Sequence, residues 1–167
     1  MQEYPTGINL NEVGTSILQY GPTACGKTIS SLTCPPPILL INTEEKDPRE
    51  IIEPLNAGKK EIDVVSPEGF DDFMSYLMGL ILLAKEGKLK YKTIFHDGLT
   101  FGQVGFQTEL EDSRALDRKD SKKYRGMIDR TRLEMPDIGV MNQIMLRSTR
   151  APTSIIKYGL MVVCTAT

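Results

Sequence analysis

The segment 21–28, with sequence GPTACGKT, restricts the fold of this chain more than any other feature. Its glycines let the backbone curl so that several N–H groups can point at one phosphate. A helix that begins near Lys27 would add the positive end of its dipole. In the pattern G-x-x-x-x-G-K-T, Lys27 reaches the β and γ phosphates and the Thr28 hydroxyl binds Mg²⁺. The segment therefore has the pattern of a P-loop, or Walker A motif, although a glycine-rich turn can also match it by chance.

The residues around this motif provide the context that it requires. The run 15–20, TSILQY, predicts a strand, and Thr28 to Leu32 predicts the start of a helix. A strand, a glycine-rich loop and a helix in this order are what a phosphate-binding loop needs. We therefore expect contact with a nucleotide from Gly21, Pro22, Thr23, Ala24, Cys25, Gly26, Lys27, Thr28 and Ile29.

Composition limits the class of protein. The chain has 167 residues, which predicts one domain spanning 1–167. The net charge of −2 provides no global basic field, so contact with nucleic acid requires a local patch. Three cysteines without paired spacing favour a reducing, cytoplasmic compartment. The N-terminus lacks the features of a signal peptide, and the apolar run 80–84 is too short to span a membrane.

Expected strands and helices alternate along the rest of the chain. Strands are predicted at 38–43, 62–65, 92–96 and 158–165, and helices at 47–55, 70–85 and 136–150. Asp47 is the expected N-cap of the first of these helices, with Pro48 at its first position. The alternation predicts an α/β fold of three layers with a mainly parallel sheet. Ligands of such folds bind at the carboxyl ends of the strands.

Two carboxylates follow predicted strands at that rim. Asp97 ends the strand TIFH and is placed to hold Mg²⁺, although it also suits a plain strand-end turn with Gly98. Glu44 follows the strand ILLINT and is placed to act as the base for the water that attacks the γ phosphate. Its neighbour Glu45 is the rival for that role, and an exposed charge is the plain alternative.

Two further residues near the rim receive weaker interpretations. Thr165, at the tip of the last strand, is a candidate for a hydrogen bond to the γ phosphate, with a solvated strand end as the alternative. His96 precedes Asp97 and should point to the opposite face of the sheet. We therefore expect His96 to contribute packing or a local hydrogen bond rather than base catalysis.

The order of these motifs resembles that of the RecA-like ATPases. The resemblance is carried by SILQYGPTACGKT, ILLINTEEKDP and TIFHDGLT. In that family a catalytic glutamate follows the second strand and a Walker B aspartate ends the third, which matches Glu44 and Asp97. With PDIGVMNQIMLRSTR and GLMVVCTAT, the chain looks similar to the phage-type nucleotide-binding ATPases linked to single-strand annealing.

The same resemblance implies a strand order. The last strand, 158–165, should lie between the P-loop strand and the strand 92–96. RecA-like cores carry a fifth strand after the last one seen here, so the chain is expected to be a fragment or a reduced domain. The P-loop strand should then lie at an edge, or beside an N-terminal strand from 7–13, and an uncovered edge favours association into a homo-oligomer.

A basic segment, 114–132, lies between the Walker B strand and the last strand. It carries eight basic residues against three acidic ones, with Tyr124 among them. RecA-like proteins place a DNA-contacting loop in this part of the chain, and an aromatic ring among cations suits stacking on a base of single-stranded DNA. The plain alternative for Arg114–Arg132 is a solvated surface loop.

Three functions fit these observations. The first is a Mg²⁺-dependent ATPase acting in phage DNA recombination or single-stranded DNA metabolism. The second is an assembly module that binds nucleotide without turnover, and the third is a small-molecule kinase. No Asn-Lys-x-Asp motif for reading guanine is present, which favours ATP over GTP.

Overall fold

A computed structural model describes residues 14–99, 105, 108 and 154–167. The predicted helix 136–150, the basic segment Arg114–Arg132 and the N-terminal stretch 7–13 lie outside the described residues. Within the described part, no helix is both long and apolar enough to cross a membrane.

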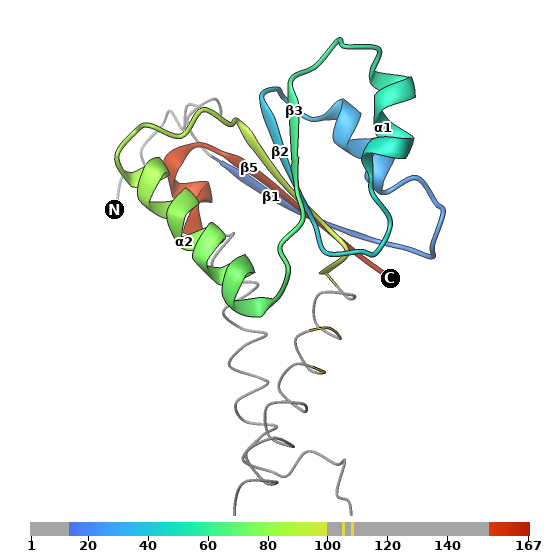
Figure 1. Cartoon of the computed structure of the whole chain (residues 1–167). Helices are drawn as coiled ribbons and strands as arrows, with labels where there is room; N and C mark the ends of the chain where they lie inside the picture. Colours follow the sequence, from blue (N-terminus) through green and yellow to red (C-terminus); the bar gives the residue numbers. More distant parts are fainter. Residues whose placement is uncertain (1–13, 100–104, 106–107, 109–153) are drawn as a thin grey trace, which may run out of the picture.

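Five parallel strands form the centre of the described structure (Figure 1). They are β1 (Thr15–Tyr20), β2 (Ile38–Asn42), β3 (Ile62–Val65), β4 (Thr93–Asp97) and β5 (Met161–Ala166). Their order across the sheet is β1-β5-β4-β2-β3. The last strand therefore lies between the P-loop strand and β4, as expected, and β1 is at the edge of the described sheet.

Within the described residues, α-helices and short 3₁₀ helices connect the strands. They are η1 (Thr28–Thr33), α1 (Arg49–Asn56), α2 (Phe70–Lys85) and η3 (Ile156–Tyr158). The prediction for α2 is confirmed, whereas the segment after the P-loop is a 3₁₀ helix that ends before the prolines at 35–37. Pro48, rather than Asp47, is the N-cap of α1, although Asp47 Oδ1 still accepts a hydrogen bond from Arg49 N at 2.9 Å.

The last strand begins three residues later than expected, at Met161. The residues before it form η3, which is closed by Gly159 with a φ of 80°. Glycine adopts this left-handed conformation without strain, so Gly159 can end η3 and let the strand begin after it.

The middle of the sheet, at β2 and β4, is buried on both faces, whereas the edge strand β1 is largely exposed. On one face Leu39 and Ile41 of β2 pack with Phe73 and Leu77 of α2. On the other face Ile38 and Leu40 of the same strand belong to a second cluster that includes Ile52 of α1. Successive residues of a strand point to opposite faces, which explains why all five residues of β2 are buried. Figure 1 shows α1 and α2 on opposite sides of the sheet, so the predicted three-layer α/β architecture is confirmed.

Candidate nucleotide-binding site

A pocket of about 300 Å³ opens at the carboxyl ends of the strands. One wall is formed by the loop after β1, and the facing wall by the loop after β2 and the start of α1. Asp97 at the end of β4 and Thr167 beyond β5 complete it. The lining residues are Thr23, Ala24, Gly26, Lys27, Thr28, Ile29, Asn42, Glu44, Lys46, Pro48, Ile51, Asp97 and Thr167.

The loop after β1 has the curled backbone that phosphate binding requires. Ala24 and Gly26 have φ angles of 64° and 90°, both in the left-handed region. Alternation between this region and the right-handed one turns successive N–H groups toward one side of a loop, which forms a concave site for an anion. Since η1 is only a six-residue 3₁₀ helix, its dipole adds little attraction for an anion at this end of the loop.

Lys27 is folded back over its own loop. Its Nζ donates hydrogen bonds to the carbonyl oxygens of Gly21 and Pro22, each at 2.8 Å, and lies 3.8 Å from Cys25 Sγ. These contacts hold the ammonium group against the curled backbone at one wall of the pocket.

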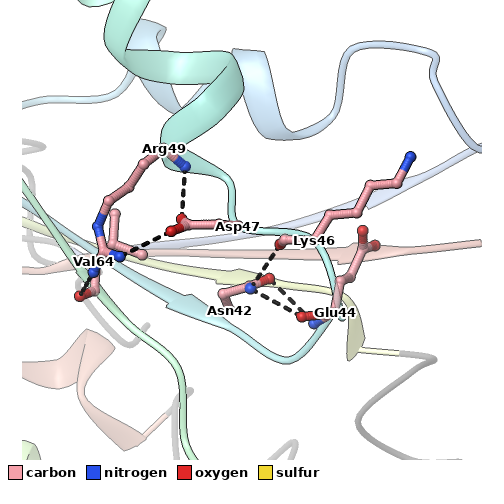
Figure 2. A network of polar contacts seen from close by, with 6 residues as sticks. All are labelled: Asn42, Glu44, Lys46, Asp47, Arg49 and Val64. Carbon is pink, nitrogen blue, oxygen red and sulfur yellow. Dashed lines mark hydrogen bonds and ion pairs between the residues drawn. The ribbon is translucent and has the colours of Figure 1, made fainter.

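The loop that carries Glu44 is anchored by a buried amide. Asn42, which is 4% exposed, donates through Nδ2 to the carbonyl oxygens of Glu44 and Lys46, both at 3.0 Å. Its Oδ1 accepts a hydrogen bond from Glu44 N at 3.1 Å. Figure 2 shows this network at the end of β2. The three bonds fix the backbone on both sides of Glu44. The neighbouring Glu45 is exposed and does not line the pocket.

The environment of Glu44 favours its protonated form more than water does. Burial raises the pKa of the Glu44 carboxyl, and the neighbouring charge of Asp97 raises this pKa further. Lys27 and Lys46 oppose both effects and lower the pKa of Glu44. A carboxylate with a raised pKa is a better acceptor for a proton from water, so the location suits a general base.

Asp97 forms the floor of the pocket and is 2% exposed. Thr165 donates a hydrogen bond to Asp97 Oδ1 at 2.6 Å and accepts one from Gly98 N at 3.0 Å. A side chain at position 98 would collide with Glu44 Cγ, and Gly98 has a φ of 88°. Glycine is therefore required where the ends of β2 and β4 come together.

Thr165 differs from its expected place. It is fully buried and is not a lining residue of the pocket; Thr167, two residues further, is. The structure thus places the Thr165 hydroxyl behind the Asp97 carboxylate, where it orients that group.

His96 lies on the face opposite to Asp97, as expected. Its ring is 1% exposed, packs against Phe73 at a centroid distance of 5.0 Å, and has Nε2 3.3 Å from Thr43 Oγ1. Burial lowers the pKa of His96 to about 4. A buried neutral ring outside the pocket fits the predicted packing role.

The pocket brings together most of the residues that the sequence indicated. Those that line it are Thr23, Ala24, Gly26, Lys27, Thr28, Ile29, Glu44 and Asp97, while Gly21, Pro22, Cys25 and Thr165 lie around it without lining it. Sequence reasoning missed Asn42, Lys46, Pro48, Ile51 and Thr167. A polar residue at the end of a wholly apolar strand, such as Asn42, is a signal that it could have used.

Comparison with solved structures identifies a similar fold. The chain superposes on a KaiC-like protein from the hyperthermophilic archaeon Pyrococcus horikoshii with a TM-score of 0.50 and 16% sequence identity. The match covers 92% of this chain and 61% of that one, so the chain spans less than two thirds of its neighbour's length. No protein-family model and no curated protein sequence matches the chain. The likeness supports the RecA-like P-loop fold and, at this identity, only the fold.

Proposed function

We propose that this chain binds ATP with Mg²⁺ and hydrolyses the bond to the γ phosphate. One observation carries the proposal: Lys27, Thr28, Glu44 and Asp97, from three separate segments, line the same pocket. A cation, a hydroxyl, a carboxylate with a raised pKa and a buried carboxylate are the groups that hydrolysis of a phosphoanhydride needs.

The residues fit the phosphates and the metal ion. The positive φ angles of Ala24 and Gly26 form a concave backbone in which phosphate oxygens would accept N–H hydrogen bonds. Thr28 and Asp97 supply oxygen atoms from two sides of the pocket, and Mg²⁺ prefers oxygen ligands and few protein side chains. Mg²⁺ would neutralise charge that develops on the phosphates.

The remaining lining residues suit a nucleoside. Ile29, Pro48 and Ile51 provide an apolar part of the pocket beside the phosphate-binding loop. Apolar walls with a few polar groups are typical of sites for small ligands, and the flat faces of a base would be buried there. The base would then lie against η1 and the start of α1.

In the proposed reaction a water molecule attacks the γ phosphorus. Its oxygen forms a new bond to phosphorus while the bond from phosphorus to the β–γ bridging oxygen breaks, giving ADP and inorganic phosphate. The Glu44 carboxylate accepts a proton from the water. Lys27 offsets negative charge on the phosphates, and Thr165 keeps the Asp97 carboxylate oriented through its 2.6 Å hydrogen bond.

The cellular role that we propose is phage DNA recombination or single-stranded DNA metabolism, in the host cytoplasm, by a single domain that forms homo-oligomers. Its support is the resemblance of the motifs and the local excess of basic residues in the segment 114–132. Contacts with phosphates release counterions, so binding of single-stranded DNA should weaken with salt by a slope of about −0.7 per phosphate contact.

Phosphate release, measured with and without single-stranded DNA, tests this proposal. We expect Mg²⁺-dependent release that DNA stimulates and that Lys27→Ala abolishes. Replacing Lys119, Lys122, Lys123 and Arg125 with alanine should remove the stimulation and keep ATP binding. ATP binding without release would favour the assembly module, and transfer to an added nucleoside or sugar would favour the kinase.

A further inference from the structure

A hydrogen bond to its main chain holds Lys46 at the pocket. The buried Asn42 amide donates to the Lys46 carbonyl oxygen at 3.0 Å, and the same amide bonds both backbone groups of Glu44. The amide that fixes the Glu44 backbone therefore also fixes the Lys46 backbone through one hydrogen bond, although the Lys46 side chain is exposed. Figure 2 shows the Glu44 and Lys46 side chains extending toward the same side of this loop.

The ammonium group of Lys46 has no described partner. Within the described residues it forms no hydrogen bond and no ion pair, whereas Lys60 donates to the Cys34 carbonyl oxygen and Lys90 pairs with Asp63. Lys27, across the pocket, already donates to two carbonyl oxygens of its own loop. Lys46 is thus a pocket cation that remains available for a ligand.

The charges of the pocket give Lys46 a role. Among the residues that the structure describes, four charged side chains line it: Lys27 and Lys46 are cationic, and Glu44 and Asp97 are anionic. Without Lys46 these side chains would carry a net charge of −1. Glu44 would then repel a terminal phosphate that lies close enough to be attacked by the water that Glu44 activates. A cation on the same loop as Glu44 offsets this repulsion, and near a protein surface such interactions are several times stronger than in bulk water.

We propose that Lys46 contacts the terminal phosphate of a nucleoside triphosphate and makes the pocket prefer triphosphate over diphosphate. The inference rests on the proposed nucleotide-binding function. The loop after β1 holds the inner phosphates on one wall, and Lys46 reaches the last phosphate from the facing wall, beside Glu44. This arrangement favours a triphosphate, because a diphosphate has no third phosphate for Lys46 to contact.

Equilibrium binding of two nucleotides tests the inference. The dissociation constants of adenylyl imidodiphosphate and of ADP, each with Mg²⁺, are measured calorimetrically for the parent and for Lys46→Met, which keeps most of the aliphatic stem. One charged hydrogen bond predicts that Lys46→Met weakens binding of the triphosphate analogue about 10–100-fold. Binding of ADP should change less than about threefold, because the contact is absent there.

Two further variants complete the experiment. Lys46→Arg keeps a cation and should retain most of the preference for triphosphate. Lys59→Met is the matched control, because Lys59 is an exposed lysine beyond the far end of α1 that does not line the pocket, and it should bind both nucleotides like the parent.

The outcomes separate this inference from the function on which it rests. If the parent binds both nucleotides and Lys46→Met leaves the ratio of the two dissociation constants unchanged, the inference is overturned while nucleotide binding stands. If the parent binds neither nucleotide, the proposed function is overturned and the inference with it. A selective loss of triphosphate affinity in Lys46→Met alone supports it.

Discussion

Thr165 donates a hydrogen bond to Asp97 Oδ1 at 2.6 Å, and the two side chains are 0% and 2% exposed. The same hydroxyl oxygen accepts a hydrogen bond from Gly98 N at 3.0 Å. One side chain on β5 therefore satisfies both the carboxylate that ends β4 and the backbone of the turn that follows it. Asp97 is held at the floor of the pocket by a neighbouring strand rather than by its own loop.

Replacing Thr165 with valine keeps the shape of the side chain and removes its hydroxyl. A buried carboxylate oxygen and a backbone N–H would lose their partner, at a cost of about 1–3 kcal/mol in the free energy of unfolding. We also expect the Mg²⁺ concentration needed for nucleotide binding to rise, because Asp97 is no longer oriented. Urea unfolding and a Mg²⁺ titration of nucleotide binding measure the two effects.

Thr165→Ser is the control for that change, since it keeps the hydroxyl. It should bind Mg²⁺ and nucleotide like the parent. If the valine and serine variants have the same Mg²⁺ requirement, the hydrogen bond does not position Asp97 for the metal.

Asn42 offers a second test, with a matched control in the same chain. Asn56 makes a similar pair of side-chain to backbone hydrogen bonds at the end of α1. Its Nδ2 donates to the Lys60 carbonyl oxygen at 2.9 Å, and its Oδ1 accepts from Lys60 N at 3.1 Å. Asn42→Ala should lower the free energy of unfolding by about 1–3 kcal/mol, and Asn56→Ala by about 0.5–1.5 kcal/mol because Asn56 is only partly buried. Only Asn42→Ala should also slow hydrolysis, by about 10–100-fold, because a small misplacement of a catalytic group has effects of that size.

Comparing phosphate release by the two alanine variants at saturating ATP separates positioning from stability. Equal rates in Asn42→Ala and Asn56→Ala would show that the hydrogen bonds of Asn42 stabilise the fold without positioning Glu44.

The sheet of this protein could be predicted well from the sequence. Wholly apolar runs such as ILLI mark strands buried on both faces, and the P-loop defines the strand before it and the loop after it. The positions of Glu44 and Asp97 at one rim follow from parallel strands, which end on the same side of a sheet. The strand order came from the family resemblance, and the structure confirms it.

Contacts between distant side chains could not be predicted in this way. Nothing in the run MVVCTA shows that Thr165 points inward to Asp97, whose position lies 68 residues earlier. The contacts of Asn42 with the Glu44 and Lys46 backbone were missed because they depend on how a short loop folds back on the strand before it.

His96 predicts how stability depends on pH. Its pKa is lowered to about 4 in the folded chain by burial, against 6.5 as its ordinary value. The unfolded chain therefore binds the proton more readily, and stability is lost as pH falls from about 6.5 toward 4. The full effect is roughly 3 kcal/mol, since one pKa unit corresponds to about 1.4 kcal/mol.

His96→Gln cannot titrate and serves as the comparison. Urea unfolding at several pH values should show the parent losing roughly 3 kcal/mol more than this variant between neutral pH and pH 4. Parallel curves for the two proteins would show that the ring is not buried in its neutral form.

Hydrolysis by Glu44→Gln, with Glu45→Gln as its neighbour control, tests the central claim most directly. Single-turnover phosphate release is followed with protein in excess over ATP and Mg²⁺, and nucleotide binding is measured on the same samples. We expect Glu44→Gln to bind nucleotide and to release phosphate about 10²–10⁴-fold more slowly than the parent, because a general base contributes that much. Glu45→Gln should match the parent, since Glu45 is exposed and does not line the pocket. Phosphate release by Glu44→Gln at the parent rate would contradict the account, and a slow Glu45→Gln would assign the base to the other carboxylate.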